Sequence, residues 1–237
     1  MNKDTKFLIE TVKLASEIIT DDFIVNSKDD NGDLVTNFDA EVEDFIIAKI
    51  KAQYPDFDVI GEESSANGKL TENCFVIDPI DGTINFANKL PLWVIQVAMI
   101  QNGETASSVI YAPKLNEFYY ADNSGAFLNG EPIQVNNLAP SKSIHFATHD
   151  IAHKLNRNPL YARNMVCAGL AYAWTASGNI GATVCGLKTP WDFVPGMHIV
   201  KQAGGTTHVH NGVNIAANSK EMLGEIVNDL GCEISRE

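Results

Sequence analysis

Hydrophobic residues recur at helical spacing in two stretches near the start of the chain. In the first stretch they are Phe7, Leu8, Val12, Leu14, Ala15, Ile18 and Ile19. In the second stretch they are Val42, Phe45, Ile46 and Ile50. Both patterns predict amphipathic helices, the second capped by Asn37 and ended by Tyr54-Pro55. The polar stretch between them, residues 26–32, predicts a mobile loop that includes Lys28.

Further along, the pattern becomes that of strands. Residues 57–60 predict a short strand, and the apolar run from residue 74 predicts a buried one. Strands are then predicted at 93–101, 105–111, 117–121 and 126–135, with hairpin-type turns at Asn102-Gly103 and Asn129-Gly130. From about residue 140, short strands alternate with helices, including one from Phe193 to Ala203 that Gly204-Gly205 ends. This order predicts a layered α/β protein with two sub-domains, residues 1–137 and 138–237.

The composition is that of an acidic globular protein. The 237 residues carry a net charge of -13, and the pI is about 4.8. This charge argues against binding to nucleic acid or to anionic membranes, which basic patches usually perform. The four cysteines are widely spaced and form no CxxC pair, which argues against a disulfide scaffold and a zinc knuckle. Without a signal peptide or a long apolar run, the sequence predicts a soluble cytoplasmic protein.

The run from Cys74 to Phe86 carries the most specific chemistry. Its apolar first part predicts a buried strand that ends at Asp78. Pro79 keeps Asp78 out of helical geometry and forces a turn. Gly82 and Thr83 then open a segment whose backbone N–H groups can bind phosphate. Two carboxylates beside such a turn suggest hard metal ions that face a phosphate.

Acidic residues stand at the ends of four predicted elements. They are Asp39, Glu62, the pair Asp78 and Asp81, and Asp192. Magnesium prefers octahedral oxygen coordination and keeps several waters, so a few carboxylates and a carbonyl suffice for each ion. A carboxylate shared by two ions would hold them roughly 3.5–4 Å apart, the arrangement used for phosphoryl hydrolysis. The sequence supplies these groups without showing that the four segments meet.

Three segments resemble the signature motifs of the inositol monophosphatase family, in the family's order and at about its spacing. They are Gly61-Glu62-Glu63-Ser64, Asp78-Pro79-Ile80-Asp81-Gly82-Thr83-Ile84-Asn85-Phe86 and Trp191-Asp192. Further matches are Asp33-Leu34-Val35-Thr36 with Asp39, residues 125–130 and Gln202-Ala203-Gly204-Gly205. The resemblance covers nearly the whole chain. It implies a layered αβαβα sandwich, a phosphoric monoester hydrolase, inhibition by lithium and a homodimer.

The resemblance also implies two or three Mg²⁺ ions. Glu62, Asp78 and the carbonyl group of Ile80 would bind the first ion. The second ion would be bound by Asp78, Asp81 and Asp192. A third ion would bind more weakly, through Glu62 and water.

The same resemblance implies how water and phosphate are held. A metal-activated water, oriented by Glu62 and by Thr83 with its partner Asp39, would attack phosphorus in line. The backbone amides of Gly82 and Thr83 would bind phosphate oxygens, and Lys28 would lie near the site. The protein would contribute positioning and charge neutralisation, as is usual for phosphoryl transfer.

Two segments depart from the family pattern, and both concern the substrate. Family members that act on inositol phosphate usually carry a glutamate where Val184 or Cys185 stands here, in a region with a one-residue insertion that includes Lys188. The usual Gly-Thr/Ser-Ala-Ala segment aligns with Gly169-Leu170-Ala171-Tyr172, so that Leu170 replaces a hydroxyl group. Loss of polar partners for substrate hydroxyls can cost orders of magnitude in discrimination. We therefore expect intact chemistry and an altered substrate pocket.

These observations predict a Mg²⁺-dependent phosphate monoesterase for a small polyol or sugar phosphate, with inositol monophosphate as the nominal substrate. A phosphatase for 3′-phosphoadenosine 5′-phosphate or fructose 1,6-bisphosphate is the alternative within this class. A catalytically idle relative with a regulatory or binding role is the alternative from another class. The complete set of metal ligands argues against it.

Histidines form two further groups. His145, His149 and His153 are spaced so that one helix face could bind zinc, but residues 143–148 favour a strand, which would scatter them. His208 and His210 are expected on one side of a solvent-facing strand, without an inferred role.

Overall fold

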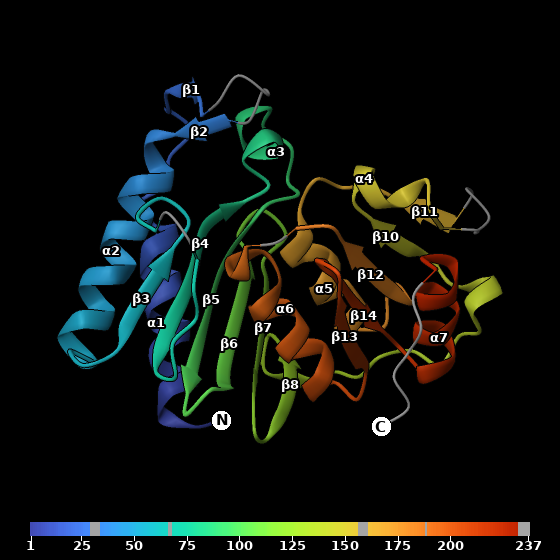
Figure 1. The fold of residues 1–237 in the computed structure, drawn as a ribbon. Helices are drawn as coiled ribbons and strands as arrows, with labels where there is room; N and C mark the ends of the chain where they lie inside the picture. The colour runs from blue at the N-terminus through green and yellow to red at the C-terminus, as the bar shows by residue number, and fades with distance from the viewer. Residues whose placement is uncertain (29–33, 66–67, 156–160, 188, 232–237) are drawn as a thin grey trace.

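The computed structural model describes residues 1–28, 34–65, 68–155, 161–187 and 189–231. Its elements form five layers in the order helix, sheet, helix, sheet and helix (Figure 1). The layered αβαβα sandwich that the resemblance implies is therefore confirmed. Among these residues, no helix combines the length and the apolar character that a membrane span requires. Asp33 and Lys188, which the sequence analysis quotes, lie outside the described residues.

A seven-stranded sheet forms the first half of the molecule. Its strands, in spatial order, are β3 (Asp58–Gly61), β4 (Cys74–Asp81), β5 (Val94–Gln101), β6 (Glu104–Ala112), β7 (Glu117–Asp122), β8 (Gly125–Leu128) and β9 (Glu131–Pro132). β3 and β4 are parallel, and the other neighbours are antiparallel. The outer face is covered by α1 (Lys3–Ser16) and α2 (Asn37–Gln53), whose apolar faces pack on it. The short strands β1 (Val25–Ser27) and β2 (Leu34–Thr36) pair just before α2.

A five-stranded sheet forms the second half. Its strands, in spatial order, are β11 (Ala162–Arg163), β10 (His145–Ala147), β12 (Ala182–Cys185), β14 (Val213–Ala217) and β13 (Thr206–His210). Between the two sheets lie α5 (Ala168–Ala176) and α6 (Pro190–Gln202). Nearly every residue of α5 is buried, as expected for a helix enclosed on all sides. The outer face is covered by α4 (His149–Ala152) and α7 (Lys220–Asp229), next to the 3₁₀ turn η1 (Pro140–Lys142).

Several element boundaries differ from the sequence prediction. The N-cap of α2 is Thr36 rather than Asn37, because the Asp39 carboxylate accepts hydrogen bonds from both the backbone and the hydroxyl group of Thr36. The strand predicted at 126–135 is divided into β8 and β9, since Asn129 and Gly130 between them take φ values of 51° and 97°. The last predicted helix begins at Pro190 rather than Phe193. Proline is favoured there because the first helical turn needs no backbone donor.

Candidate active site

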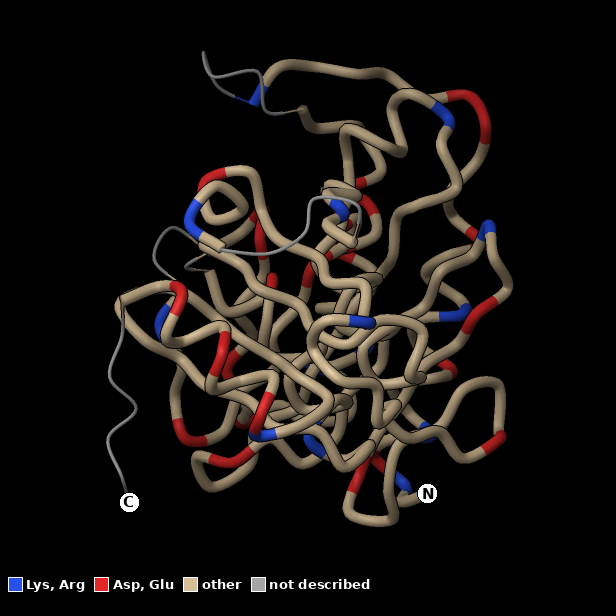
Figure 2. Tube along the Cα trace, turned by 90° about the vertical axis from the view of Figure 1, so that its right-hand side faces the viewer, with Lys and Arg blue, Asp and Glu red and all other residues tan. Residues whose placement is uncertain are grey.

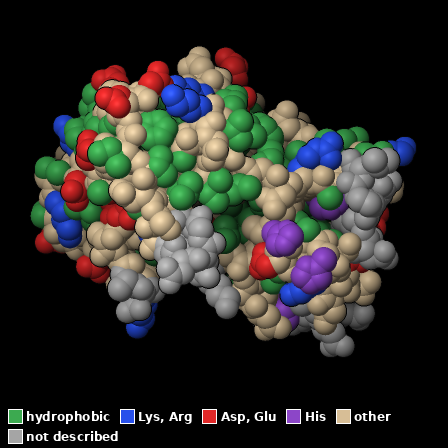
Figure 3. Space-filling view, turned by 90° about the horizontal axis from the view of Figure 1, so that it is seen from above, with side chains coloured by type: hydrophobic (Ala, Val, Ile, Leu, Met, Phe, Trp, Pro, Cys, Tyr) green, Lys and Arg blue, Asp and Glu red, His purple; other side chains and the backbone are tan. Residues whose placement is uncertain are grey.

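A cavity of about 680 Å³ lies where β4 ends, beside the first turns of α5 and α6. Its acidic part is lined by Glu62, Asp78, Asp81 and Asp192. The structure thus brings together carboxylates from three distant segments. Figure 3 looks down on this side of the molecule, where hydrophobic side chains gather along the middle of the surface.

A β-bulge in β4 directs two aspartates to the same side of the sheet. In the regular part of β4, odd-numbered apolar side chains pack toward α1 and α2, and even-numbered ones toward α6. Asp78 follows this alternation onto the inner side. The register shift between Asp78 and Asp81 then interrupts it, so that Ile80 packs outward and Asp81 turns inward toward α5. The strand therefore continues to Asp81, and the prediction that it ends at Asp78 was wrong.

The first turns of α5 and α6 hold the other two inner carboxylates. Asp81 accepts hydrogen bonds from the backbone N–H of Ala168 at 3.2 Å and of Gly169, and the Cys167 thiol donates to it at 3.4 Å. Asp192 lies in the first turn of α6 and accepts from the hydroxyl group of Thr189. Helix N-termini offer unpaired N–H groups and partial positive charge, so they stabilise carboxylates.

The short helix α3 (Thr83–Ala87) begins directly after this pair. Its N-cap is Gly82, which takes a φ of 90°. A Cβ atom added to this residue would lie only 2.9 Å from the backbone oxygen of Leu92, so the position has room only for glycine. The Thr83 hydroxyl oxygen lies 2.8 Å from the Ile80 carbonyl oxygen and 3.3 Å from Asp39 Oδ1. Because a hydroxyl group has one proton, it donates to Ile80 here, and Asp39 is its second available acceptor.

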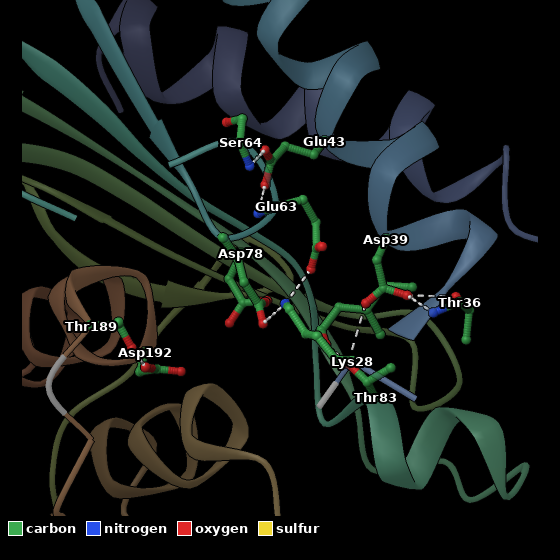
Figure 4. A network of polar contacts seen from close by, with 12 residues as sticks. Lys28, Thr36, Asp39, Glu43, Glu63, Ser64, Asp78, Thr83, Thr189 and Asp192 are labelled. Carbon is green, nitrogen blue, oxygen red and sulfur yellow. Dashed lines mark hydrogen bonds and ion pairs between the residues drawn. The ribbon is translucent and has the colours of Figure 1, made fainter. Parts of the chain in front are cut away.

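Lys28 places a positive charge beside the carboxylates. Its Nζ atom lies 2.9 Å from Glu62 Oε1 and 2.6 Å from Glu63 Oε1. Figure 4 shows the lysine reaching toward Glu63, with Asp39 on one side and Asp192 on the far side of Asp78. The structure therefore places Lys28 within the site, next to a predicted metal ligand.

Two polar residues of the site were missed by the sequence analysis. Glu43 is buried and accepts hydrogen bonds from the backbone N–H groups of Glu63 at 2.9 Å and Ser64 at 2.8 Å, which fixes the turn that carries Glu62. Gln96 is buried and donates to Asp78 Oδ2 at 3.2 Å. Each is a polar residue within an otherwise apolar stripe of a helix or strand, and this signal could have identified both.

Burial dominates the electrostatics of the cavity. It raises the pKa of Asp78 well above its usual range, and the charges of the neighbouring carboxylates raise it further. Burial also raises the pKa of Asp81 to about 6, against the hydrogen bonds from α5. It raises the pKa of Glu62 to about 7, although Lys28 opposes this shift. Asp and Glu residues are spread along the whole trace (Figure 2), in keeping with the net charge of -13.

The donor set fits a hard cation. The Asp78 Oδ1 atom is buried and has no hydrogen-bond partner within the described part of the chain. Such an oxygen is costly to bury unless a cation binds it, and the groups around it are oxygen donors. Within the described residues, no three His, Cys, Asp or Glu side chains converge into a complete metal-binding cluster as they stand. The chemistry of the residues therefore suits Mg²⁺, whereas their side-chain positions do not yet enclose an ion.

Of the predicted substrate residues that the structure describes, Lys28 lines the cavity, whereas the others are placed differently from the expectation. Leu170 and Ala171 are fully buried within α5, Val184 and Cys185 are fully buried in β12, and none of the four lines the cavity. Gly169 uses its backbone N–H to bind Asp81. The cavity wall away from the carboxylates is formed instead by Ile84, Phe146, Thr148, His149, Asn164, Val166, Leu187 and Trp191. The cavity is therefore lined by residues 164 and 166–168, just before and at the start of α5. The segment that the resemblance indicated, residues 169–172, already lies inside the helix.

The histidines do not share one face. His145 belongs to β10, whereas His149 begins α4 and His153 is its C-cap, so the predicted strand is confirmed. His208 and His210 stack on one side of β13 with ring centroids 5.9 Å apart. They therefore lie on one side of the strand, as predicted, and both are half-buried, whereas Val209 between them is exposed.

Comparisons with known proteins agree with this geometry. The model of the inositol monophosphatase family matches residues 1–229. A fructose-1,6-bisphosphatase/inositol-1-monophosphatase of Thermotoga maritima is 34% identical over 199 residues, which cover 81% of this chain and 77% of that protein. A histidinol-phosphatase of Chlorobaculum parvum is 30% identical over 229 residues, covering 90% and 88%. The solved structure of a Thermotoga maritima IMPase matches with a TM-score of 0.83 at 30% identity, covering 96% of this chain and 95% of that one.

Proposed function

We propose that this chain, which belongs to the inositol monophosphatase family and is therefore a phosphoric monoester hydrolase, hydrolyses a small phosphorylated metabolite with Mg²⁺. The observation that carries this proposal is the buried Asp78 carboxylate, whose Oδ1 atom has no hydrogen-bond partner among the described residues. A cation would satisfy this oxygen, and Glu62, Asp81 and Asp192 offer further oxygen ligands in the same cavity.

The residues divide into two sets of metal ligands. Glu62, Asp78 and the carbonyl oxygen of Ile80 would hold one ion, and Asp78, Asp81 and Asp192 a second. A weaker third ion would rely on Glu62. When bound, Mg²⁺ would neutralise phosphate charge and lower the pKa of water.

The protein's own groups would position the water and the phosphate. If the Ile80 carbonyl oxygen binds a metal ion, the Thr83 hydroxyl group would donate to Asp39 instead. The hydroxyl oxygen of Thr83 could then accept a hydrogen bond from the attacking water. The backbone amides of Gly82 and Thr83, at the start of α3, would bind phosphate oxygens. Lys28, which lines the cavity, adds a positive charge beside Glu62.

The alcohol part of the substrate is the open question within this class. A polyol or sugar phosphate such as inositol monophosphate is the first candidate, with 3′-phosphoadenosine 5′-phosphate or fructose 1,6-bisphosphate as alternatives. The names of the Thermotoga and Chlorobaculum relatives support a small-molecule ester. We expect a cytoplasmic homodimer. A catalytically idle regulatory protein is the alternative from another class, and the contact between Asp39 and Thr83 argues against it.

The test is phosphate release from a panel of these esters, with Mg²⁺ and with a chelator. We expect turnover that requires Mg²⁺, is inhibited by lithium and is lost in Asp81→Asn. Calorimetric titration with Mg²⁺ serves as the control that the ion binds. Binding of Mg²⁺ without turnover of any ester would contradict the proposal and favour the idle protein.

A further inference from the structure

We propose that Val166 selects the alcohol part of the substrate and favours phosphate esters whose alcohol has an apolar or aromatic face. This inference rests on the proposed function, because it concerns the same cavity. Val166 is β-branched yet takes a φ of 52°, a left-handed conformation that such residues rarely adopt. The residue is 47% exposed and lines the cavity, so burial in the core does not account for its conformation.

The strained backbone is held in place by the central motif. The buried Asn85 side chain donates hydrogen bonds to the carbonyl oxygens of Met165 at 2.6 Å and Leu92 at 2.7 Å. On the other side, the backbone N–H of Val166 donates to Asn164 Oδ1 at 3.2 Å. These contacts determine the conformation from both sides, which is the condition under which strain persists.

Val166 also lies directly beside the turn proposed to bind phosphate. A Cβ atom added to Gly82 would be only 3.2 Å from the carbonyl oxygen of Val166. An ester whose phosphate rests on Gly82 and Thr83 would therefore place its alcohol against the Val166 side chain.

The wall that the alcohol would meet is mostly apolar. Besides Val166 it contains Phe146, Leu187, Trp191 and Ile84, which is 38% exposed, whereas Thr148, His149 and Asn164 are its polar members. A polyol needs a polar partner for each buried hydroxyl group, and each unpaired group lowers its affinity. An alcohol with a flat apolar or aromatic face matches this wall better. Among the candidate substrates, the inference therefore favours a nucleoside-like or aryl-bearing ester over an open polyol.

The experiment compares two esters with similar alkyl leaving groups. The probes are 2-phenylethyl phosphate and glycerol 3-phosphate, and the readout is the ratio of their kcat/KM values with saturating Mg²⁺. We expect the wild type to prefer the phenylethyl ester by roughly tenfold or more. In Val166→Asn, which keeps a side chain of similar size and tolerates positive φ, we expect the ratio to fall roughly tenfold.

Three further variants distinguish the effect of the strained backbone at Val166 from that of the contact between its side chain and the alcohol. Val166→Gly should lower the ratio and raise the melting temperature by about 2–4 °C, since it relieves the backbone. Val166→Thr keeps the shape and the strain, so it should lower the ratio without raising the melting temperature. Leu138→Ala is the matched control, because Leu138 is equally exposed and does not line the cavity.

Each outcome decides the matter. An unchanged ratio in Val166→Asn and Val166→Gly, with both esters turned over, overturns this inference and leaves the phosphatase intact. A wild type that prefers glycerol 3-phosphate overturns it as well. Absence of turnover with every ester overturns both the inference and the proposed function.

Discussion

Asp78 and Asp122 are two buried aspartates of the same sheet with opposite surroundings. The two residues expose 1% and 2% of their surface. Asp122, at the end of β7, accepts hydrogen bonds from the backbone N–H groups of Asn2 and Ser124 at 2.7 and 2.8 Å and from the hydroxyl groups of Thr5 and Ser124. Asp78 accepts one, from Gln96, and Oδ1 has no partner within the described residues.

The protonation of the two groups differs accordingly. Burial alone would raise the pKa of Asp122, but its hydrogen bonds outweigh burial and lower the pKa to about 2. Burial raises the pKa of Asp78, and little opposes it. Because β4 to β7 are antiparallel, the two residues lie at opposite ends of the sheet (Figure 1). A fully hydrogen-bonded carboxylate stabilises the fold, whereas one short of partners marks the place for a cation.

The largest effect is expected for Asp78→Asn. Phosphate release should fall by roughly a thousandfold or more, because a ligand shared by both metal sets is lost. The melting temperature should stay the same or rise, since a buried like charge is removed. Phosphate-release kinetics and calorimetric melting measure the two quantities. If Asp78→Asn kept its activity and had a lower melting temperature, Asp78 would be a structural residue like Asp122 and the contrast between the two aspartates would be wrong.

Asp122→Asn is the reciprocal change. It should lower the free energy of unfolding by about 2–4 kcal/mol, because several buried donors lose a charged acceptor. The activity of the folded fraction should stay within about twofold, since the site is distant. Urea unfolding gives the first quantity and kcat/KM the second. A large loss of kcat/KM in the folded protein would show that the two ends of the sheet are coupled.

Glu43→Gln tests whether a carboxylate whose two oxygens both accept hydrogen bonds can also position a metal ligand, Glu62. We expect kcat/KM to fall by about 10–100-fold and Mg²⁺ affinity to weaken, because the amide accepts only one of the two N–H bonds that fix the turn of Glu62. Calorimetric Mg²⁺ titration distinguishes positioning from a general loss of structure. Glu41→Gln, an exposed position on the same helix, is the control. Equal behaviour of the two variants would exclude the positioning role.

The smallest effect concerns acid stability. The pKa of Asp122 is about 2 in the folded protein and 3.8 ordinarily, so its stabilisation is present above about pH 4 and is lost as the pH falls toward 2. Melting temperatures measured in half-unit pH steps should therefore drop more steeply in the wild type than in Asp122→Asn over this window. Parallel curves would mean that the hydrogen bonds of Asp122 do not lower its pKa.

The local chemistry of the site could be predicted from the sequence. The first part of β4, Cys74 to Ile77, is apolar because both of its faces are covered, and Pro79 and Gly82 restrict the backbone that follows. The direction of the side chains could not be predicted. Alternation alone would send Asp78 and Asp81 to opposite faces, and the bulge that unites them depends on pairing with β5.

Other features depend on contacts between distant segments. The sequence places Glu43 within the apolar stripe of a helix, but the groups that it binds belong to the turn at 62–64, which only the folded chain brings there. Nothing in the sequence indicates a positive φ at Val166, because valine disfavours it and the restraint comes from Asn85. The sequence analysis assigned the substrate pocket to two other segments instead, Gly169–Ala171 and the region of Val184 and Cys185, which the structure places within α5 and β12.

The hydrogen bonds between Asp81 and α5 also determine when the site can form. Asp81 emerges from the ribosome well before Ala168 and Gly169. In a nascent chain whose seven-stranded sheet is complete, the Asp81 carboxylate is therefore still hydrated and lacks its hydrogen bonds from α5. The cavity is then completed only when the second half docks and supplies the first turns of α5 and α6. During refolding, recovery of phosphatase activity should lag behind recovery of the sheet signal, which makes catalysis a reporter of the last step of assembly.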